Sequence, residues 1–413
     1  MSKRFLLIAG NFSPELNGIG KYNGEMIKWL SANGYECTVI TTYPYYPEWK
    51  VQAPYTQKKY RYSKEILQDN GLKITVYRCP QYVPAKPSGK KRMILDFSFV
   101  LSATWKLLQL LPAKKFDFVM AVVPSFHLGL LAILYKQLRG AKFLYHIQDL
   151  QIEAARDFNM IRSSWLINIM LSVEKYILSQ ADIISSISEG MIRKIQEKAN
   201  KDIILFPNWV DVSQFYPIEN RTALKMEYGF KATDKILLYS GAIGEKQGLE
   251  SILYTAKALQ DQDDLKFLIC GSGPYKEQLY LQATTLQLSN VIFLPLQPYE
   301  YFNRFLNMAD IHLVIQKSSA SDLVMPSKLT TIMAVGGLAL ITTNSGSSMY
   351  ELIQRYKMGI LVNADNLQAL KEGVNRAITE NGKDIARNAR AYAETNLSVG
   401  QIMSRFTKVV ANG

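Results

Sequence analysis

The sequence predicts an α/β protein with two doubly wound domains, each holding a parallel sheet with helices on both faces. Short apolar segments rich in β-branched and aromatic residues recur along the chain, and helix-length amphipathic segments separate them. This series occurs twice in tandem, which indicates two domains. At 413 residues the chain is also too long for a typical single hydrophobic core.

The expected strands are continuous apolar runs, which is typical of parallel sheets that are buried on both faces. In the first half of the chain they are Phe5–Ala9, Cys37–Thr41, Lys73–Tyr77, Phe118–Val123, Phe143–Ile147, Ile183–Ile187 and Ile203–Phe206. In the second half they are Ile236–Ser240, Lys266–Cys270, Val291–Leu294, Ile311–Ile315, Leu338–Thr342 and Gly359–Val362.

The domain boundary is expected at Pro207–Asp211, after the last strand of the first series. We therefore expect an N-terminal domain of residues 1–206 and a C-terminal domain of residues 207–391. The three cysteines are far apart and show no metal-ligand spacing, so the sequence suggests neither a disulfide framework nor a zinc site. A reducing compartment fits this usage best, and the N-terminus reads as a first core strand and not as a signal peptide.

The net charge of +13 is concentrated in the first half of the chain. Residues 1–205 contain 28 Lys and Arg against 16 Asp and Glu, whereas the remainder contains 20 against 19. This asymmetry predicts an anionic partner for the N-terminal domain, namely a nucleic acid, an anionic membrane or a phosphate-bearing substrate.

One segment favours the membrane among these partners. The basic cluster Lys90–Arg92 leads into the apolar run Met93–Leu111, which is about the length of a membrane span. Asp96 and Lys106 interrupt the run, and charges at bilayer depth are costly. A helix lying on the membrane surface and a core helix with a solvated basic loop both remain open, and the charge asymmetry favours the membrane.

A first glycine turn, Gly18-Ile-Gly20, follows the first strand and precedes an expected helix over Tyr22–Asn33. Glycines at such a turn let the backbone approach a ligand, and the helix N-terminus attracts negative oxygen. The spacing does not match the dinucleotide fingerprint, so a tight connection without a ligand remains an alternative.

A second candidate site is His146-Ile-Gln-Asp149, at the carboxyl end of an expected N-domain strand. That edge of an open α/β sheet faces the ligand. His146 and Asp149 could orient a sugar hydroxyl or polarise a reacting group. The alternative is a half-buried histidine with its hydrogen bonds satisfied.

A third candidate is the glycine-rich turn after the first C-domain strand, which contains Gly241, Gly244 and Lys246. Backbone amides and one fixed cation at such a turn form a cradle for two phosphates. A second turn with Gly271 and Gly273 follows the next strand and can admit a base or a ribose.

The fourth candidate is the segment from Ser321 to Leu329. Pro326 precedes a helix, which places Lys328 in its first turn, where a cation is unfavourable for the helix dipole. We therefore expect Lys328 to serve a bound anion, with Asp322 and Ser327 beside it. A surface lysine lying over its helix is the alternative.

Taken together and in order, these motifs resemble glycosyltransferase family 4. Within it they resemble a subgroup of bacterial capsule, exopolysaccharide and O-antigen synthesis, and they are nearest to the group of proposed colanic-acid fucosyltransferases. The segments that carry the resemblance are Gly18–Gly20, Tyr43–Trp49, His146–Asp149, Ile187–Met191, Pro207–Asp211, Ser240–Glu250 and Asp322–Leu329.

The resemblance implies a GT-B fold, in which two Rossmann-like domains face each other across a cleft and the donor binds the C-terminal domain. It implies a retaining hexosyltransferase that needs no metal or other cofactor and takes a GDP- or UDP-linked sugar, such as fucose or another deoxy or N-acetyl sugar. The acceptor would be a polyprenyl-diphosphate-linked saccharide at the inner face of the cytoplasmic membrane. The final segment, from about Tyr392 to Gly413, would cross back to the N-terminal domain.

Two features depart from the family pattern. Ala242 stands where an arginine is expected, and Lys246 is shifted by one residue. The Glu-x7-Glu pair is missing, and Asp322, Lys328 and Thr331 occupy its region. Lys328 could therefore supply the second positive charge that the arginine would give.

The expected chemistry is the departure of a nucleoside diphosphate that Lys246 and Lys328 neutralise. His146 would contact the sugar, and the leaving phosphate would take the acceptor proton in a front-face attack, with Asp149 as the alternative base. Two other functions are weighed against this one. A nucleic-acid-binding protein is disfavoured because no recognisable binding motif accompanies the basic charge. A nucleotide-sugar epimerase or a phosphorylase would share the same fold.

Overall fold

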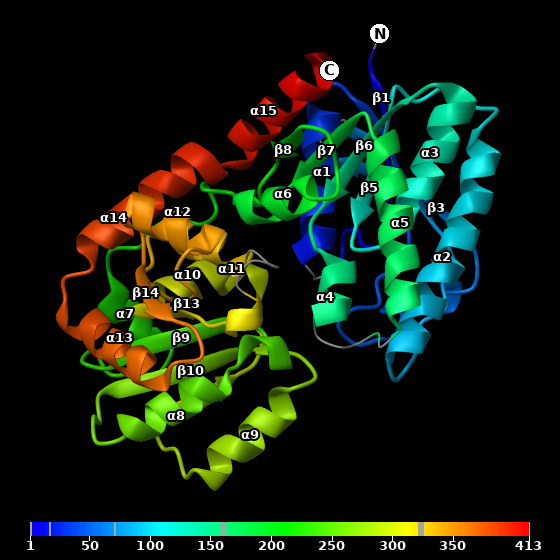
Figure 1. The fold of residues 1–413 in the computed structure, drawn as a ribbon. Coiled ribbons are helices and arrows are strands. Elements are labelled where there is room, and N and C mark those ends of the chain that lie inside the picture. The colour runs from blue at the N-terminus through cyan, green and yellow to red at the C-terminus, as the bar shows by residue number, and fades with distance from the viewer. Residues whose placement is uncertain are drawn as a thin grey trace. The chain divides into compact units, whose positions relative to one another are not determined.

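The computed structural model describes residues 2–15, 18–69, 72–157, 161, 163–320 and 326–412. The chain forms two compact units (Figure 1). The N-terminal unit comprises Met1–Pro207 together with Met403–Gly413, and the C-terminal unit comprises Asn208–Ile402. Residues 392–402, which the sequence places in the returning segment, lie in the C-terminal unit.

The N-terminal unit contains an eight-stranded sheet in the order β3-β4-β2-β1-β5-β6-β7-β8. Its central strands are buried along their length, as their uninterrupted apolar sequences predict. The strands are β1 Arg4–Ala9, β2 Glu36–Thr41, β3 Ser63–Asp69, β4 Leu72–Arg78, β5 Phe118–Val123, β6 Lys142–Ile147, β7 Ile183–Ser186 and β8 Ile203–Leu205.

The edge strand β3 differs from the prediction, which contains no strand between β2 and β4. Within the described residues, β3 is the antiparallel member of the sheet and pairs with β4, from Ser63 opposite Arg78 to Asp69 opposite Leu72. Its sequence mixes charged and apolar residues because only one edge of the strand is paired and it is not buried on both faces. A search for continuous apolar runs therefore misses it.

The helices of the N-terminal unit are α1 Gly18–Ala32, α2 Gly89–Leu110, α3 Leu128–Arg139, α4 Gln151–Asp157, α5 Ser164–Gln180 and α6 Glu189–Gln196. The helix α3 contacts both α2 and α5, so these three helices lie side by side on one face of the unit (Figure 1). The last helix, α15 Val399–Asn412, begins in the C-terminal unit and ends in the N-terminal one.

The C-terminal unit contains a six-stranded parallel sheet in the order β11-β10-β9-β12-β13-β14. Its strands are β9 Lys235–Ala242, β10 Leu265–Ser272, β11 Val291–Leu294, β12 Ile311–Val314, β13 Ala339–Thr343 and β14 Ile360–Asn363. Its α-helices are α7 Arg221–Glu227, α8 Glu250–Ala258, α9 Lys276–Thr285, α10 Phe302–Met308, α11 Lys328–Ala334, α12 Ser348–Tyr356, α13 Leu367–Thr379 and α14 Lys383–Tyr392.

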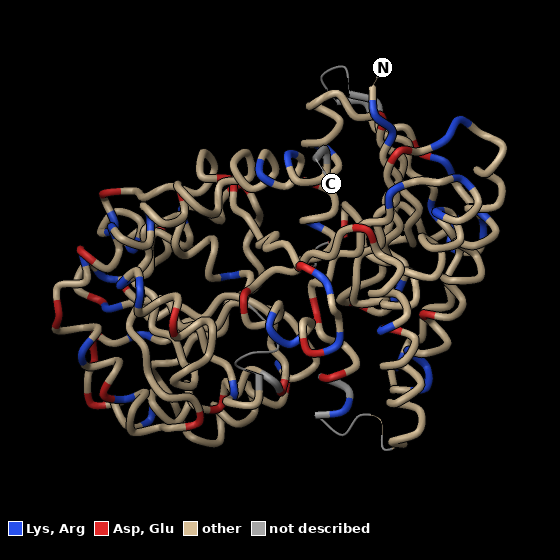
Figure 2. The backbone as a smooth tube through the Cα atoms, turned by 45° about the horizontal axis from the view of Figure 1, so that its top comes forward, with Lys and Arg blue, Asp and Glu red and all other residues tan. Residues whose placement is uncertain are grey.

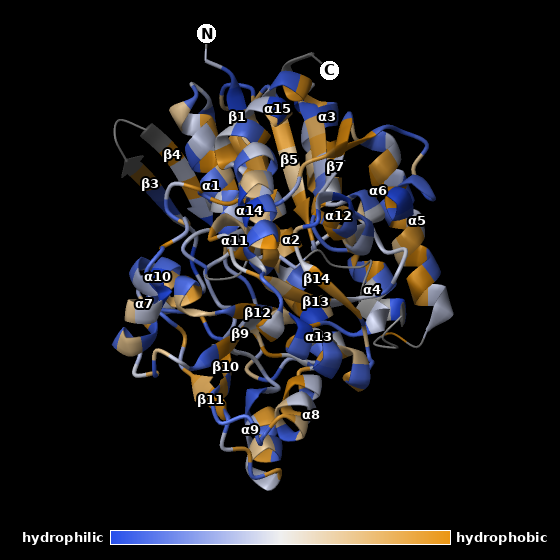
Figure 3. Ribbon diagram, turned by 90° about the vertical axis from the view of Figure 1, so that its left-hand side faces the viewer, coloured by the Kyte–Doolittle hydropathy of each residue, from blue (hydrophilic) through white to orange (hydrophobic). Residues whose placement is uncertain are grey.

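Alternate residues of β9 pack into two separate apolar clusters, one on each face of this sheet. Ile236 and Leu238 belong to the cluster with α10 and α11, whereas Leu237 and Tyr239 belong to the cluster with α8. Figure 3 shows the apolar colour on strands of both sheets. This double burial explains why the strand is apolar at every position from Ile236 to Tyr239.

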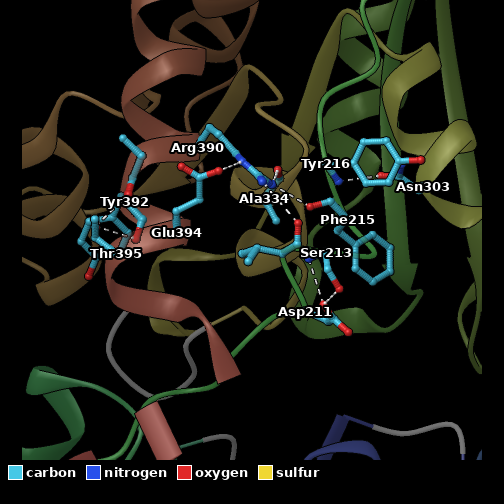
Figure 4. A network of polar contacts seen from close by, with 12 residues as sticks. Asp211, Ser213, Phe215, Tyr216, Asn303, Ala334, Arg390, Tyr392, Glu394 and Thr395 are labelled. Atoms are coloured by element: carbon cyan, nitrogen blue, oxygen red, sulfur yellow. Dashed lines mark hydrogen bonds and ion pairs between the residues drawn. The ribbon is translucent and has the colours of Figure 1, made fainter. Parts of the chain in front are cut away.

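Arg390 of α14 connects three parts of the C-terminal unit (Figure 4). Its guanidinium donates to the carbonyl oxygens of Val212 and Phe215 in the segment that enters the unit, and to that of Ala334 at the end of α11. Its Nε also donates to Glu394 Oε1 at 2.7 Å. The helix that begins at Lys328 is therefore tied at its far end to the entering segment.

Candidate active site

His146 lies near the carboxyl end of β6 and is 3% exposed. Its Nδ1 is 3.0 Å from Ser185 Oγ on the neighbouring strand β7, which pairs with it in register. Burial lowers the pKa of the imidazole to about 3, so the ring is neutral at physiological pH. A neutral imidazole held at one nitrogen can offer the other to a ligand hydroxyl.

Asp149 lies two residues beyond β6 and is partly exposed, so it follows the same strand edge as His146. The two glycines of the first predicted turn lie elsewhere than expected. The helix α1 begins at Gly18, not at Tyr22, so Gly18 and Gly20 lie in its first turn and not in the connection before it. Gly24, further along α1, packs closely against the segment before the helix, because a Cβ there would lie 2.7 Å from Ser13 Cβ.

In the C-terminal unit, the predicted glycine turns meet at the carboxyl ends of β9 and β10. Gly271 pairs with Gly241, and an added Cβ at Gly271 would lie 1.9 Å from the Gly241 oxygen. A Cβ at Gly273 would lie 2.1 Å from the Ile243 oxygen. These two glycines are therefore required by the contact between the two strand ends, whether or not a ligand is bound.

The turn after β9 passes through Gly244 into a short 3-10 helix, Glu245–Gln247, and ends at Gly248 with φ of +65°. The Gly244 amide donates to the Gln247 side-chain oxygen at 3.1 Å. Lys246 occupies the centre of this turn, but its side chain lies outside the described residues. Asp322 also lies outside them.

Lys328, the first residue of α11, carries a buried Nζ with no hydrogen-bond partner among the described residues. Part of the residue remains exposed, but the ammonium nitrogen is out of contact with solvent. It lies 3.6 Å from the centre of the Tyr239 ring. Burial lowers the pKa of Lys328 to about 7.

Lys328 also reaches the glycine turn of β9. A Cβ added at Gly241 would lie 3.0 Å from both Cε and Nζ of Lys328. Gly241 has a φ of +151°, so the backbone and the lysine both restrict this position to glycine. The structure thus brings Lys328 together with Gly241 and Gly271, whereas Ser327 lies exposed at the start of α11.

Two further lysines border these turns and are absent from the sequence prediction. Lys276, at the start of α9, donates to the Gly271 oxygen at 3.1 Å. The Lys317 side chain, which follows β12, lies over Gly248, where an added Cβ would be 3.0 Å from its Cγ. In the sequence, Lys276 can be identified as a candidate by its position three residues after Gly273 of the second glycine turn.

A cavity of about 660 Å³ opens beside the turn that contains Lys246, on the side of α8, α9 and α13. Two tyrosines, a lysine and several carboxyl, amide and hydroxyl groups line it. None of the described residues that the sequence predicts for the site lines this cavity. The lining residues are Gly248, Glu250, Ser251, Tyr254, Tyr275, Gln278, Gln282, Lys317, Asp365, Asn366 and Leu367.

Within the described part of the chain, no group of three or more His, Cys, Asp or Glu residues is placed to hold a metal ion. The cysteines Cys37, Cys79 and Cys270 are free and buried. Burial raises the pKa of the Cys37 and Cys79 thiols to about 12, so neither is a thiolate nucleophile at neutral pH.

Comparison with known proteins defines the class of this fold. Sucrose-phosphate synthase from Thermosynechococcus elongatus superposes with a TM-score of 0.76 at 14% identity, over 99% of this chain and 98% of that one. Anabaena Alr3699/HepE, solved in complex with UDP and glucose, gives a TM-score of 0.72 at 14% identity over 100% of both chains. The fold is that of the GT-B glycosyltransferases.

The family follows from the sequence comparisons. The family model "Glycosyl transferase 4-like domain" matches residues 17–209, and "Glycosyl transferases group 1" matches residues 220–395. The putative colanic acid biosynthesis glycosyl transferase WcaI of Escherichia coli (strain K12) is 36% identical over 411 residues, which cover 98% of each chain. The protein belongs to this family of group 1 and 4-like glycosyltransferases.

Proposed function

We propose that the protein transfers a sugar from a nucleoside-diphosphate sugar to a saccharide carried on polyprenyl diphosphate, in the synthesis of a cell-surface polysaccharide. The single observation that supports this best is the Lys328 Nζ, which is buried beside the glycine turn at Gly241 and has no hydrogen-bond partner in the described part of the chain. A buried cation without a counterion is costly, and a diphosphate would supply the missing charge. The colanic acid relative and the UDP complex of the Anabaena protein agree with this chemistry.

In the proposed mechanism, Lys328 and Lys246 neutralise the leaving diphosphate as the bond between sugar and phosphate breaks. His146 holds a sugar hydroxyl as a neutral imidazole. The acceptor hydroxyl attacks from the face that the diphosphate leaves, and a departing phosphate oxygen takes its proton. The anomeric configuration is then retained. Asp149 is the alternative base. The sugar we propose is fucose or another deoxy or N-acetyl hexose, linked to GDP or UDP.

The donor prediction is tested by thermal unfolding with a panel of GDP- and UDP-sugars. A cognate donor at about a hundred times its Kd stabilises the folded state by about 2.7 kcal/mol, so one member is expected to raise the midpoint by several degrees. Transfer with that donor is expected to continue in excess EDTA, because two lysines take the role of a metal. Loss of transfer in EDTA that manganese restores would contradict the metal-free scheme, and an epimerised sugar from donor alone would indicate an epimerase.

We also propose that the N-terminal unit lies on the inner face of the cytoplasmic membrane through α2, α3 and α5. By length and composition α2 could span a bilayer, but 22% of its most apolar window is buried in the protein. Phe97, Leu101 and Trp105 are 63%, 58% and 56% exposed and lie one turn apart on one face of α2. Such a stripe is typical of a helix lying in the membrane interface.

Two neighbouring helices extend this surface. Leu130 and Leu138 of α3 are exposed, as are Trp165 and Tyr176 of α5. From Gly89 to Arg139 the chain contains eight Lys and Arg against two Asp. Figure 2 shows the Lys and Arg residues along the backbone of the described chain. Anionic lipid headgroups attract each basic residue near the surface by about 1 kcal/mol. Apolar area and positive charge thus favour an anionic bilayer as the partner of this face.

The double variant Phe97→Asp with Trp105→Asp is expected to lower binding to phosphatidylglycerol-containing vesicles at least about tenfold, because two apolar anchors become anions. Co-sedimentation with vesicles measures the change. Leu281→Asp is the matched control, since Leu281 is 62% exposed on α9 of the C-terminal unit. Binding of the double variant equal to that of wild type would contradict the proposed surface.

A further inference from the structure

Two phenylalanine rings pack one behind the other on one side of His146, the histidine that we propose contacts the donor sugar. The His146 ring meets the Phe206 ring edge to face, with centroids 5.0 Å apart at an angle of 64°. Phe206 in turn stacks on Phe406, with centroids 4.1 Å apart at 17°. His146, Phe206 and Phe406 are 3%, 2% and 2% exposed. Phe206 and Phe406 therefore form a buried and nearly parallel pair, and the imidazole meets the first of them edge to face.

The two phenylalanines come from the two places where the chain passes between the units. Phe206 directly precedes Pro207, the last residue of the first N-terminal segment. Phe406 lies on α15, three residues after the chain returns to this unit at Met403. Figure 1 shows the end of α15 and the N-terminus of the chain in the same unit. One connection thus contributes the ring that contacts His146, and the other contributes the ring that packs against Phe206.

Without this support the orientation of the His146 ring would be weakly fixed. The torsion that rotates an imidazole is broad and has no sharp staggered minimum. Among the described residues, Nδ1 of the ring shares a hydrogen bond of 3.0 Å with Ser185 Oγ, which sets a pivot. The Phe206 ring bounds the imidazole on one side, and Phe406 packs directly against Phe206.

We propose that Phe406 is a positioning residue for sugar transfer and that it acts through Phe206 on the ring of His146. This inference rests on the proposed role of His146 in contacting the donor sugar. Since a displacement of about 1 Å in a contact group can reduce a rate by two orders of magnitude, a tilt of the ring is sufficient to matter. The C-terminal helix α15 accordingly helps to position His146, in addition to packing against the N-terminal unit.

The test is Phe406→Leu, which keeps an apolar side chain but removes the flat ring. We expect kcat to fall about tenfold with the KM for the donor within about twofold of wild type, because contact geometry changes more than donor binding. Phe116→Leu is the matched control. Phe116 is 1% exposed in the same unit and packs on Tyr135 at 5.7 Å, so its loss lowers stability without reaching His146.

A double-variant comparison separates positioning from general destabilisation. In a His146→Ala background, Phe406→Leu is expected to change kcat by less than about twofold, since the ring it positions is gone. Normal kcat in Phe406→Leu, or an equal loss in Phe116→Leu, would overturn the proposal. So would an undiminished tenfold effect in the His146→Ala background. Wild-type turnover in His146→Ala would instead refute the proposed role of His146.

Discussion

Lys328→Ala is expected to lower the rate of sugar transfer by about a hundredfold, because it removes a positioned positive charge from the leaving diphosphate. The charge is not replaced by solvent, since the Nζ of Lys328 is buried and without a hydrogen-bond partner among the described residues. Steady-state kinetics with the cognate donor, followed by product analysis, measures the effect. Lys257→Ala is the control, because Lys257 is an exposed lysine on α8 of the same unit.

Lys328→Ala should not unfold the protein. The described residues provide no hydrogen-bond partner for the buried Lys328 Nζ, and burial of a charge is costly. Lys328→Met, which keeps the volume and removes the charge, is therefore expected to raise the unfolding midpoint. Loss of activity together with a gain of stability is the pattern of a residue kept for its ligand. Near-normal transfer in both Lys328 variants would contradict the diphosphate assignment.

The pH dependence gives a second measure of the same residue. The pKa of Lys328 is about 7 in the folded protein and 10.5 when unperturbed, so between these values the unfolded chain holds a proton that the folded chain does not. This group therefore adds stability as the pH rises through that window, and Lys328→Met is expected to remove the contribution. Affinity for a nucleoside diphosphate should show the opposite trend. It should be highest below about pH 7 and fall by up to tenfold per unit above it, because the anion binds the protonated form.

The parallel sheets could be predicted because a strand that is buried on both faces is apolar at every position. The run from Ile236 to Tyr239 is apolar at every position since its alternate residues enter two different cores. The strand β3 has no such continuous apolar run, because it lies at a sheet edge and pairs on one side. Its antiparallel partner β4 contains the apolar run Lys73–Tyr77 that the sequence predicts as a strand.

The candidate site was predictable in its residue types and not in its contacts. Glycines and lysines after strands can be identified from spacing alone, and their strand edge follows from parallel topology. The approach of Lys328 to Gly241, however, depends on how α11 packs against the end of β9. Phe406 cannot be selected from the sequence, since 200 residues separate it from Phe206 and the return of α15 brings the two rings together.

Gly271→Ala is expected to disrupt donor binding and to lower the stability of the C-terminal unit by about 3 kcal/mol, the upper part of the range for overpacked cores. The added Cβ would lie 1.9 Å from the Gly241 oxygen and 3.1 Å from its carbonyl carbon. A backbone atom cannot rotate away as a side chain can, so the end of β9 must move. Gly241 also lies beside Lys328, since a Cβ added at Gly241 would be 3.0 Å from the lysine Nζ, and the displacement is therefore expected to reach the proposed phosphate site.

Calorimetric titration with the nucleoside diphosphate, at a temperature where the variant is folded, separates the two effects. Gly400→Ala is the matched control, because an added Cβ at Gly400 in α15 has no neighbour within 4 Å. That control is expected to change stability by less than about 0.5 kcal/mol, because Gly400 is the second residue of α15 and not in its interior. A folded Gly271→Ala protein with wild-type affinity for the nucleoside diphosphate would show that the ends of β9 and β10 can accommodate the added Cβ without moving Lys328. The link between glycine packing and the phosphate site would then be wrong.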